Sequence, residues 1–424
     1  MIFDFQVFFQ TFRDIGFIFS FLAPYKWAVL PVLAYFAFLI ARDVLLFSSQ
    51  AKWKREIEWD VFEIRVPREI EKGPKAMEQF FTSFWTLFNT PADWKQKYFD
   101  GEVTRWHSLE IYGSGGRAGF YMRVPKKFRH LVESMLYAEY PEIEIVDSPD
   151  YTLEVPNTFE KMEAVGLDLS GVELALKNPA PNPITTYVAF EEKGGEERII
   201  DPVSMILETM SRLRPEEKAW VQMVVKPILP NWQKEGKKTI EEVKKEAAPK
   251  PGPAGTPVFS MRTPAEEEKL KMISHKISKQ GFEVIVRTIY IAPKDIFDRS
   301  LLKNLTGYFN QYSSNLNYFQ FAPGTYTGAY WYKWPFLFPG KRAKIKKDRL
   351  LNRYVQRYMP EATFSGRLAD PDRPLLFDKR PSVSILNTEE LATLFHPPTN
   401  VVLTSQSMER IESKKVGPPS YIPF

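Results

Sequence analysis

Between residues 56 and 147 the hydrophobic positions change their period several times along the chain. Apolar and polar residues alternate in four stretches, as in strands with one buried face, and recur at helical spacing in two others. The predicted strands are 56–67, 105–112, 117–125 and 142–147, and the predicted helices are 75–88 and 126–140. This β-α-β-β-α-β order is that of a ferredoxin-like unit, which we place at residues 56–155.

The stretch IYGSGGRAGFY, at 111–121, is rich in glycine and lies between two of these strands. A phosphate-binding loop needs a helix after its glycines, whereas the pattern here predicts a strand. The chain also contains no Walker A sequence. We therefore expect a tight hairpin turn, which needs positive φ angles and so favours glycine.

A similar order of patterns recurs over residues 156–325, where we predict a second ferredoxin-like unit. Its elements are a strand at 184–192, a helix at 201–213, a strand at 218–229, a helix at 263–281, a strand at 282–293, a helix at 294–312 and a short strand at 317–321. Asp201 and Thr263 are the predicted helix caps, with Pro202 as the first helical residue and Gly281 as a stop. A charged run followed by Pro, Ala and Gly predicts a mobile insertion at 231–262.

The segment WAVLPVLAYFAFLIA, at 27–41, has no charged residue. Extended to Phe47 it reaches the roughly 20 apolar residues that cross a bilayer, if Arg42 and Asp43 lie near one edge. We predict one transmembrane anchor at 25–50, and its candidate lipid-facing residues are Trp27, Leu30, Leu33, Phe36, Phe38 and Leu39. The positive cluster that follows, Lys52, Lys54 and Arg55, predicts that the bulk of the chain is cytoplasmic.

Residues 1–24 are rich in aromatic side chains but are interrupted by Asp4, Arg13 and Asp14. We predict an interfacial amphipathic helix there, and a second membrane span closed at Pro24 is the alternative. A cleaved signal peptide is disfavoured, because the apolar segment is too long and charged residues separate it from the small residues at 48–52.

Residues 326–424 combine an aromatic and basic segment with a Pro-rich, extended tail. The aromatic residues cluster at 330–338, and the basic residues that follow are Lys341, Arg342, Lys344, Lys346, Lys347, Arg349, Arg353 and Arg357. Three interpretations stay open: a solvated basic helix, a contact with anionic lipid, and a contact with the backbone of a nucleic acid such as DNA. Further on, NTEELATLF at 387–395 predicts a helix capped by Asn387 or Thr388.

Composition excludes several kinds of site. The 424 residues include no cysteine, which excludes disulfides, thiolate catalysis and zinc–thiolate centres. The four histidines are scattered, and the net charge of +5 is small for this length. We predict no catalytic residue, cofactor or metal, and a hydrolase using Glu142 and Glu144 is the weakest interpretation.

The sequence LNTEELATLFHPP at 386–398, followed by ESKKVGPPSYIP at 412–423, resembles a junction in bacterial membrane-anchored ATPases of the conjugation type. These are similar to the coupling proteins of type IV secretion and to FtsK/HerA-like DNA pumps. Further similarity lies at 66–81, 109–152, 184–192 and 201–227. The resemblance implies a membrane anchor and an α/β region, with a RecA-like motor after the junction.

The motor's Walker motifs are absent from this sequence, so no ATPase residue can be carried over. We therefore expect a non-enzymatic, single-pass protein of the bacterial inner membrane with an α+β fold. It would dock or assemble a machine that moves DNA or protein, beside a separate RecA-like ATPase and with homo-oligomerisation as an option. The alternative is a membrane-bound nucleic-acid-binding protein that uses residues 341–357.

Overall fold

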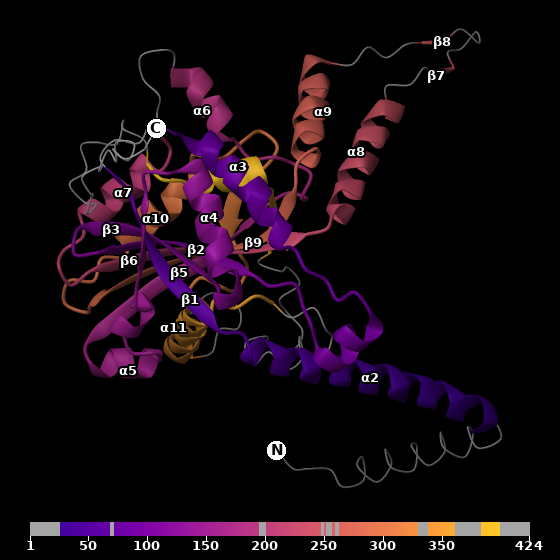
Figure 1. The fold of residues 1–424 in the computed structure, drawn as a ribbon, viewed down its shortest axis with the longest axis horizontal. Coiled ribbons are helices and arrows are strands. Elements are labelled where there is room, and N and C mark those ends of the chain that lie inside the picture. Colours follow the sequence, from indigo (N-terminus) through magenta and orange to yellow (C-terminus); the bar gives the residue numbers. More distant parts are fainter. Residues whose placement is uncertain are drawn as a thin grey trace, which may run out of the picture. The chain divides into compact units, whose positions relative to one another are not determined.

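The computed structural model describes residues 26–67, 72–194, 201–246, 250–251, 257–258, 263–329, 338–360 and 383–398 (Figure 1). These residues belong to two compact units. The anchor unit comprises the described parts of 1–56, 90–103 and 360–375, and the body comprises those of 57–89, 104–359 and 376–424. The predicted interfacial helix at 1–24, the aromatic residues 330–337 and the tail from residue 399 lie outside the described residues.

The anchor unit contains one long helix, α2 (Lys26–Arg55). Its segment Leu30–Arg55 is long and apolar enough to cross a membrane. Among the predicted lipid-facing residues, the exposed side chains are Leu30, Leu33, Phe36 and Phe38, whereas Leu39 is half-buried and the side chain of Trp27 lies outside the described part. A helix that exposes large apolar side chains over this length is suited to lipid rather than to water.

The body is built on one antiparallel sheet, with nine strands among the residues described. The order is β10-β5-β9-β6-β2-β3-β1-β4, and β11 also pairs with β9. The strands are β1 (Trp59–Arg65), β2 (His107–Ser114), β3 (Arg117–Pro125), β4 (Glu144–Asp147), β5 (Leu167–Leu176), β6 (Lys218–Ile228), β9 (Gly281–Pro293), β10 (Phe319–Phe321) and β11 (Ser384–Asn387). The predicted α+β class is therefore confirmed, but the strands of both predicted units belong to one sheet, joined where β2 pairs with β6.

The glycine-rich stretch forms the turn of the β2–β3 hairpin. Ser114 pairs with Arg117, and the two residues between them, Gly115 and Gly116, have φ angles of 56° and 79°. Both angles are in the left-handed region, which side chains with a Cβ rarely adopt. The predicted turn is confirmed.

The predicted strand at 184–192 is wrong. Residues Tyr187–Gly194 form helix α6, and the strand that opens the second half of the sheet is β5, which the sequence pattern did not reveal. Strand β9 pairs with β6 along one edge, and with β5 and β11 along the other. No edge of β9 is left for residues 184–192, so their high strand propensity is overridden by tertiary context.

The prediction of a mobile insertion at 231–262 is also wrong for its first half. Residues Gln233–Glu246 form helix α8, which packs against α9 (Pro264–Ile277). Trp232, Ile273 and Ile277 form a small buried cluster at the base of this pair. The two-residue strands β7 (Lys250–Pro251) and β8 (Pro257–Val258) pair with each other further along. The high charge of residues 233–246 suggested a linker, but the charged side chains of residues 234–242 lie on the exposed faces of a helix that has one apolar face.

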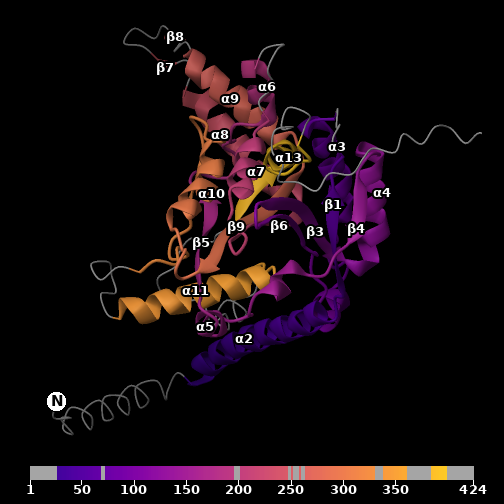
Figure 2. The same ribbon diagram turned by 90° about the vertical axis from the view of Figure 1, so that its left-hand side faces the viewer.

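Helices cover both faces of the body's sheet (Figure 2). The larger apolar core includes side chains of α3 (Pro74–Phe84), α4 (Arg129–Glu139), α7 (Ser204–Ser211), α10 (Ser300–Asn310) and α13 (Thr388–Leu394). A second cluster on the sheet includes α5 (Phe159–Ala164) and α11 (Pro339–Val355). The second face also carries buried charges, which are described below.

Candidate functional site

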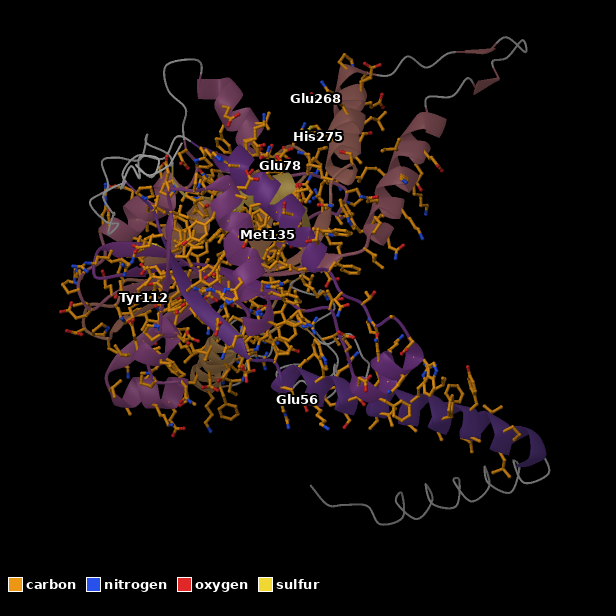
Figure 3. The ribbon with its side chains drawn as sticks, viewed as in Figure 1. Glu56, Glu78, Tyr112, Met135, Glu268 and His275 are labelled. Carbon is orange, nitrogen blue, oxygen red and sulfur yellow. The ribbon has the colours of Figure 1, made fainter. Side chains whose placement is uncertain are left out.

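A groove of about 860 Å³ opens on the body. Its lining comes from α3, from α6 and the residues before it, from α9 and from the start of α13. Figure 3 places Glu268 and His275 along α9, and Glu78 on α3. The lining mixes acids and bases with apolar residues such as Ile184, Val188 and Met272.

A chain of charged side chains forms part of this lining. The Nε2 of His275 lies 2.7 Å from the Oε2 of Glu389, and Lys279 forms ion pairs with both Glu389 and Glu78. The hydroxyl of Tyr187 donates to Glu78 over 2.6 Å. This chain links α3, α6, α9 and α13. Its outer end reaches solvent, since the His275 side chain is 58% exposed while that of Glu389 is 4% exposed.

Electrostatics favour the charged forms of the central pair. Burial raises the pKa of Glu389, but hydrogen bonds from Lys279, Thr186 and His275 outweigh it, and the pKa lies below its ordinary value. Burial lowers the pKa of Lys279, but its bonds to Glu389 and Glu78 outweigh that too, and the net shift is upward. Burial and the Glu78 carboxylate raise the pKa of Tyr187, so its phenol keeps the proton that it donates.

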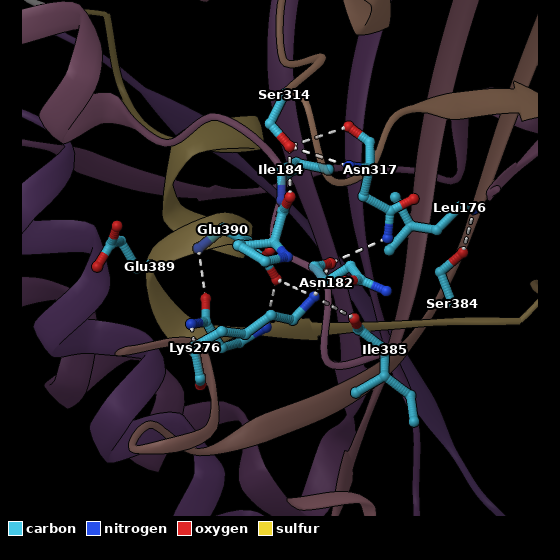
Figure 4. Close-up of polar contacts among 12 residues, drawn as sticks. Leu176, Asn182, Ile184, Lys276, Ser314, Asn317, Ser384, Ile385, Glu389 and Glu390 are labelled. Atoms are coloured by element: carbon cyan, nitrogen blue, oxygen red, sulfur yellow. Dashed lines mark hydrogen bonds and ion pairs between the residues drawn. The ribbon is translucent and has the colours of Figure 1, made fainter. Parts of the chain in front are cut away.

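A second pair, Lys276 and Glu390, lies beneath the groove and is sealed from solvent. Their charged atoms are 3.0 Å apart, and the side chains are 1% and 0% exposed. Lys276 Nζ also donates to the carbonyls of Asn182 and Ile385, and Glu390 accepts from the backbone N–H of Ile184 (Figure 4). Burial lowers the pKa of Lys276, and the opposing effect of Glu390 does not fully compensate for it.

These contacts give the NTEELATLF motif its role in the fold. Asn387 caps α13 and forms a capping box with Glu390, which confirms the predicted cap. All seven residues of α13 are buried. The burial of Glu389 and Glu390 was not predicted from the sequence. A signal was present, because His275, Lys276 and Lys279 place complementary bases on neighbouring turns of one predicted helix.

The end of the same motif is held by a buried histidine. His396 Nε2 lies 3.0 Å from Asp201 Oδ1, and its Nδ1 lies 2.8 Å from the carbonyl oxygen of Ala392. Asp201 also accepts from the backbone N–H of Val203, while α7 begins at Ser204. Asp201 thus orders the turn before the helix rather than capping it, which corrects the predicted boundary.

The predicted basic contact residues belong to α11 and the residues after it, but few of them are available to a partner. Lys341 and Lys344 are exposed, whereas Arg342, Lys346, Lys347, Arg349 and Arg353 are at most half-exposed. Lys344 pairs with Glu163, Lys347 with Asp168 and Arg353 with Glu173. Lys346 donates to the carbonyls of Tyr326 and Gly328. Most of this charge therefore holds α11 on the body.

Arg357 is 1% exposed, so the prediction that it contacts an external partner is wrong. Its guanidinium bonds Glu110 over 2.9 Å and Asp150 over 2.6 Å. Burial raises the pKa of Glu110. The charge of Arg357 and the hydrogen bonds from Arg357 and Tyr151 lower this pKa by more than burial raises it, so the net shift is downward. The pair of Glu110 and Arg357 belongs to a row of buried polar side chains that crosses the sheet. We call this row, which comprises Glu110, Gln222, Arg287, Glu173 and Arg357, the sealed ladder.

The sealed ladder follows the register of four strands. Glu110 of β2 is opposite Gln222 of β6, which is opposite Arg287 of β9, which is opposite Glu173 of β5. Each neighbouring pair is joined by a hydrogen bond of 2.9–3.0 Å. The segment after α11 closes the row, since Arg357 bonds Glu110 and the carbonyl of Tyr358 accepts from Arg287.

Within the described residues, no group of three or more acidic or histidine side chains could hold a metal ion. His107 is fully buried beside Phe84, with ring centres 4.6 Å apart, and burial lowers its pKa to about 3. His130 is exposed. The predicted acid pair, Glu142 and Glu144, is exposed, and Glu144 pairs with Arg65 at 3.9 Å.

Comparison with protein families places the chain in a family without an assigned function. A family model described as "Domain of unknown function (DUF8128)" matches residues 47–409. This range contains the whole sheet, the groove and the α13 motif. A comparison with curated proteins found no match.

Proposed function

The chain belongs to this DUF8128 family of unknown function, and we propose that it is a membrane-anchored docking protein whose groove receives a segment of a partner protein. It would be non-enzymatic and would act in a machine that moves DNA or protein, beside a separate RecA-like ATPase. The observation that carries this proposal is the open groove of about 860 Å³ above a rigid, ion-paired base. The kind of machine is proposed from the resemblance of the sequence to membrane-anchored ATPases of the conjugation type.

The groove suits a peptide better than a phosphate-rich ligand. Acidic and basic side chains alternate around it, including Glu268, Lys271 and Glu191, so no single sign of charge dominates. Apolar side chains between them offer the contact area on which peptide binding depends. Because the base is fixed by buried ion pairs, little ordering is needed when a partner binds.

The membrane part of the proposal rests on α2 and the charges at its end. The helix ends with Lys52, Lys54 and Arg55 in its last turn. Positive residues beside a span favour the cytoplasmic side, so we place the body in the cytoplasm and α2 in the inner membrane of a bacterium.

Strand order supports the proposal of two ferredoxin-like units. In the run β4-β1-β3-β2, and again in β10-β5-β9-β6, the fourth, first, third and second strands follow one another. This is the order of an antiparallel βαββαβ unit. We propose that the two units share one sheet through β2 and β6, and that exposed edges such as β4 are where copies of the chain would assemble.

Purification of the full chain from native membranes in mild detergent tests the docking function. A stoichiometric ATPase that co-purifies, and that is lost with Lys271→Glu but retained with Lys303→Glu, would support it. Both lysines are exposed helix residues, but only Lys271 lines the groove. A chain that purifies alone, or equal binding by both variants, would contradict it.

The second candidate, a nucleic-acid-binding protein, rests on Lys341 and Lys344, which are exposed on α11. It predicts a DNA affinity that falls steeply with salt and that the double variant Lys341→Gln/Lys344→Gln weakens. The ion pairs of the other basic residues on α11 favour the docking function instead.

A further inference from the structure

A short segment of the anchor unit packs against the membrane helix. The π-helix η3 (Gln96–Asp100) lies beside the C-terminal part of α2, and the hydroxyl of Ser49 donates to the carbonyl of Tyr98 over 2.8 Å. The contact is close at Gly101, where φ is 69° and an added Cβ would lie 2.2 Å from the carbonyl carbon of Ser49. Only glycine fits there, so this packing is a specific feature of the chain.

The same segment exposes two large aromatic rings. Trp94 is 68% exposed and Phe99 is 62% exposed, and their rings meet edge to face with centres 5.5 Å apart. Lys95 and Lys97 are exposed beside them. Exposed tryptophan and lysine side chains, here flanked by the exposed acids Asp93 and Asp100, are typical of a membrane–water interface, where the ring contacts acyl chains and the ammonium groups meet headgroup phosphates.

The position along α2 matches that interface. With a rise of about 1.5 Å per residue, Ser49 lies roughly 28 Å along the helix from Leu30. The hydrocarbon core of a bilayer is about 30 Å thick. If Leu30 lies at one boundary of the hydrocarbon, Ser49 and the segment packed on it lie at the other. Arg42 then lies roughly 10 Å inside the second boundary, and its long side chain must extend toward the headgroups there.

We propose that residues 94–99 form an interfacial anchor that inserts Trp94 and Phe99 into the boundary of the bilayer, with Lys95 and Lys97 on anionic headgroups. The proposal rests on the membrane anchoring by α2 proposed above. It adds a second contact with lipid, off the axis of the helix. A helix alone is free to tilt and rotate, whereas two contacts fix its depth and its rotation.

The absence of cysteine from the sequence makes a direct test simple. Three variants of the full chain, Phe99→Cys, Phe38→Cys and Leu153→Cys, each carry one spin label and are placed in vesicles of phosphatidylcholine with phosphatidylglycerol. Leu153 is an exposed body residue and reports water, whereas Phe38 lies in the apolar part of α2 and reports lipid. The measured quantity is the label's accessibility to oxygen relative to a water-soluble nickel complex.

We expect the ratio of oxygen to nickel accessibility at position 99 to be higher than at the water-exposed position 153 and lower than at position 38 in the lipid. A ratio at 99 equal to that at 153, with lipid contact at 38, overturns the interfacial anchor while α2 still spans the membrane. A water-like ratio at both 38 and 99 overturns the membrane anchoring itself. Because all three labelled side chains are exposed, their replacement leaves the buried cores intact.

Charge provides the second measurement. Lys95→Gln/Lys97→Gln should shift the label at 99 toward water in vesicles that contain phosphatidylglycerol, and should have less effect in pure phosphatidylcholine. The matched control is Lys126→Gln, an exposed body residue. Equal shifts in both vesicles would overturn the assignment of the two lysines to anionic headgroups.

Discussion

Two groups of ion pairs lie in the body, and they differ in their access to water. In the sealed ladder, Glu110, Arg287 and Arg357 are at most 1% exposed, and the strands β2, β6, β9 and β5 contribute one member each. The second group, which we call the groove chain, comprises Glu78, Tyr187, His275, Lys279 and Glu389. In it Glu389 is buried, but Lys279 is 21% exposed and His275 is 58% exposed. The charged groups of the sealed ladder form their hydrogen bonds with one another. In the groove chain, by contrast, some side chains contact water and can bind a ligand in its place.

This difference separates a structural use of charge from a binding use. A buried network in which every group has a partner adds little net stability compared with apolar packing. Removing one member, however, leaves the charge of its partner buried and unpaired, which strongly destabilises the fold. The sealed ladder thus fixes where α11 sits on the sheet. The groove chain holds four elements together and still offers polar atoms at the surface, which is what a docking site needs.

The strongest test of this comparison is Arg357→Met. The variant leaves Glu110 buried without its cation, which should lower the free energy of unfolding by about 3–5 kcal/mol. Chemical denaturation of the full chain in detergent measures this, with Lys341→Met as the exposed control. A loss no larger than that of the control would mean that the ladder is not sealed in solution.

Exclusion of water from the opposite face of the sheet can be tested with a histidine that packs against Phe84. His107 has a folded pKa of about 3, whereas an unfolded histidine has a pKa of about 6.5. Between these values the unfolded state binds the proton and the folded state does not, so stability is complete above about pH 6.5 and falls as the pH drops.

At pH 5 this loss should amount to about 2 kcal/mol relative to pH 7, before ordinary carboxylates titrate. His107→Leu should remove that part of the pH dependence, and His130→Gln, at an exposed position, should leave it unchanged. The measurement is denaturant unfolding at pH 7, 6 and 5. An identical slope in His107→Leu and the parent would show that water reaches the site.

A smaller effect is expected in the groove. Lys279→Met should cost about 1 kcal/mol, because His275 remains beside Glu389 and the partly exposed carboxylate of Glu78 can take up water instead. Lys303→Met, at an exposed position of α10 outside the groove lining, is the control. A loss as large as that of Arg357→Met would remove the distinction between the two groups.

The smallest effect is expected at the surface of α11. Lys344 pairs with Glu163, but the Lys344 side chain is 58% exposed, so Lys344→Met should not change the unfolding midpoint measurably. A clear loss would mean that the exposed charges of α11 contribute to its docking on the sheet as the buried ones do.

Local signals in the sequence predicted much of this fold. The alternating strands of the first half, the glycine hairpin and the caps Thr263 and Asn387 depend on neighbouring residues, and the structure confirms them. Strand β5 was missed because its alternation of apolar and polar residues changes phase at Gly171. Arg357 and Glu389 were misjudged for a related reason. Their partners are 247 and 110 residues away, and no local pattern reports such distances.

The position of β11 and α13 has a consequence for biosynthesis. Strand β11 completes the edge of β9, and α13 supplies Glu390 to the buried Lys276, yet both are made more than a hundred residues after α9. A chain emerging from the ribosome therefore carries an unpaired strand edge and an uncompensated ammonium group until residue 394 is free. Translation must therefore run almost to the end of the family region before the body can close.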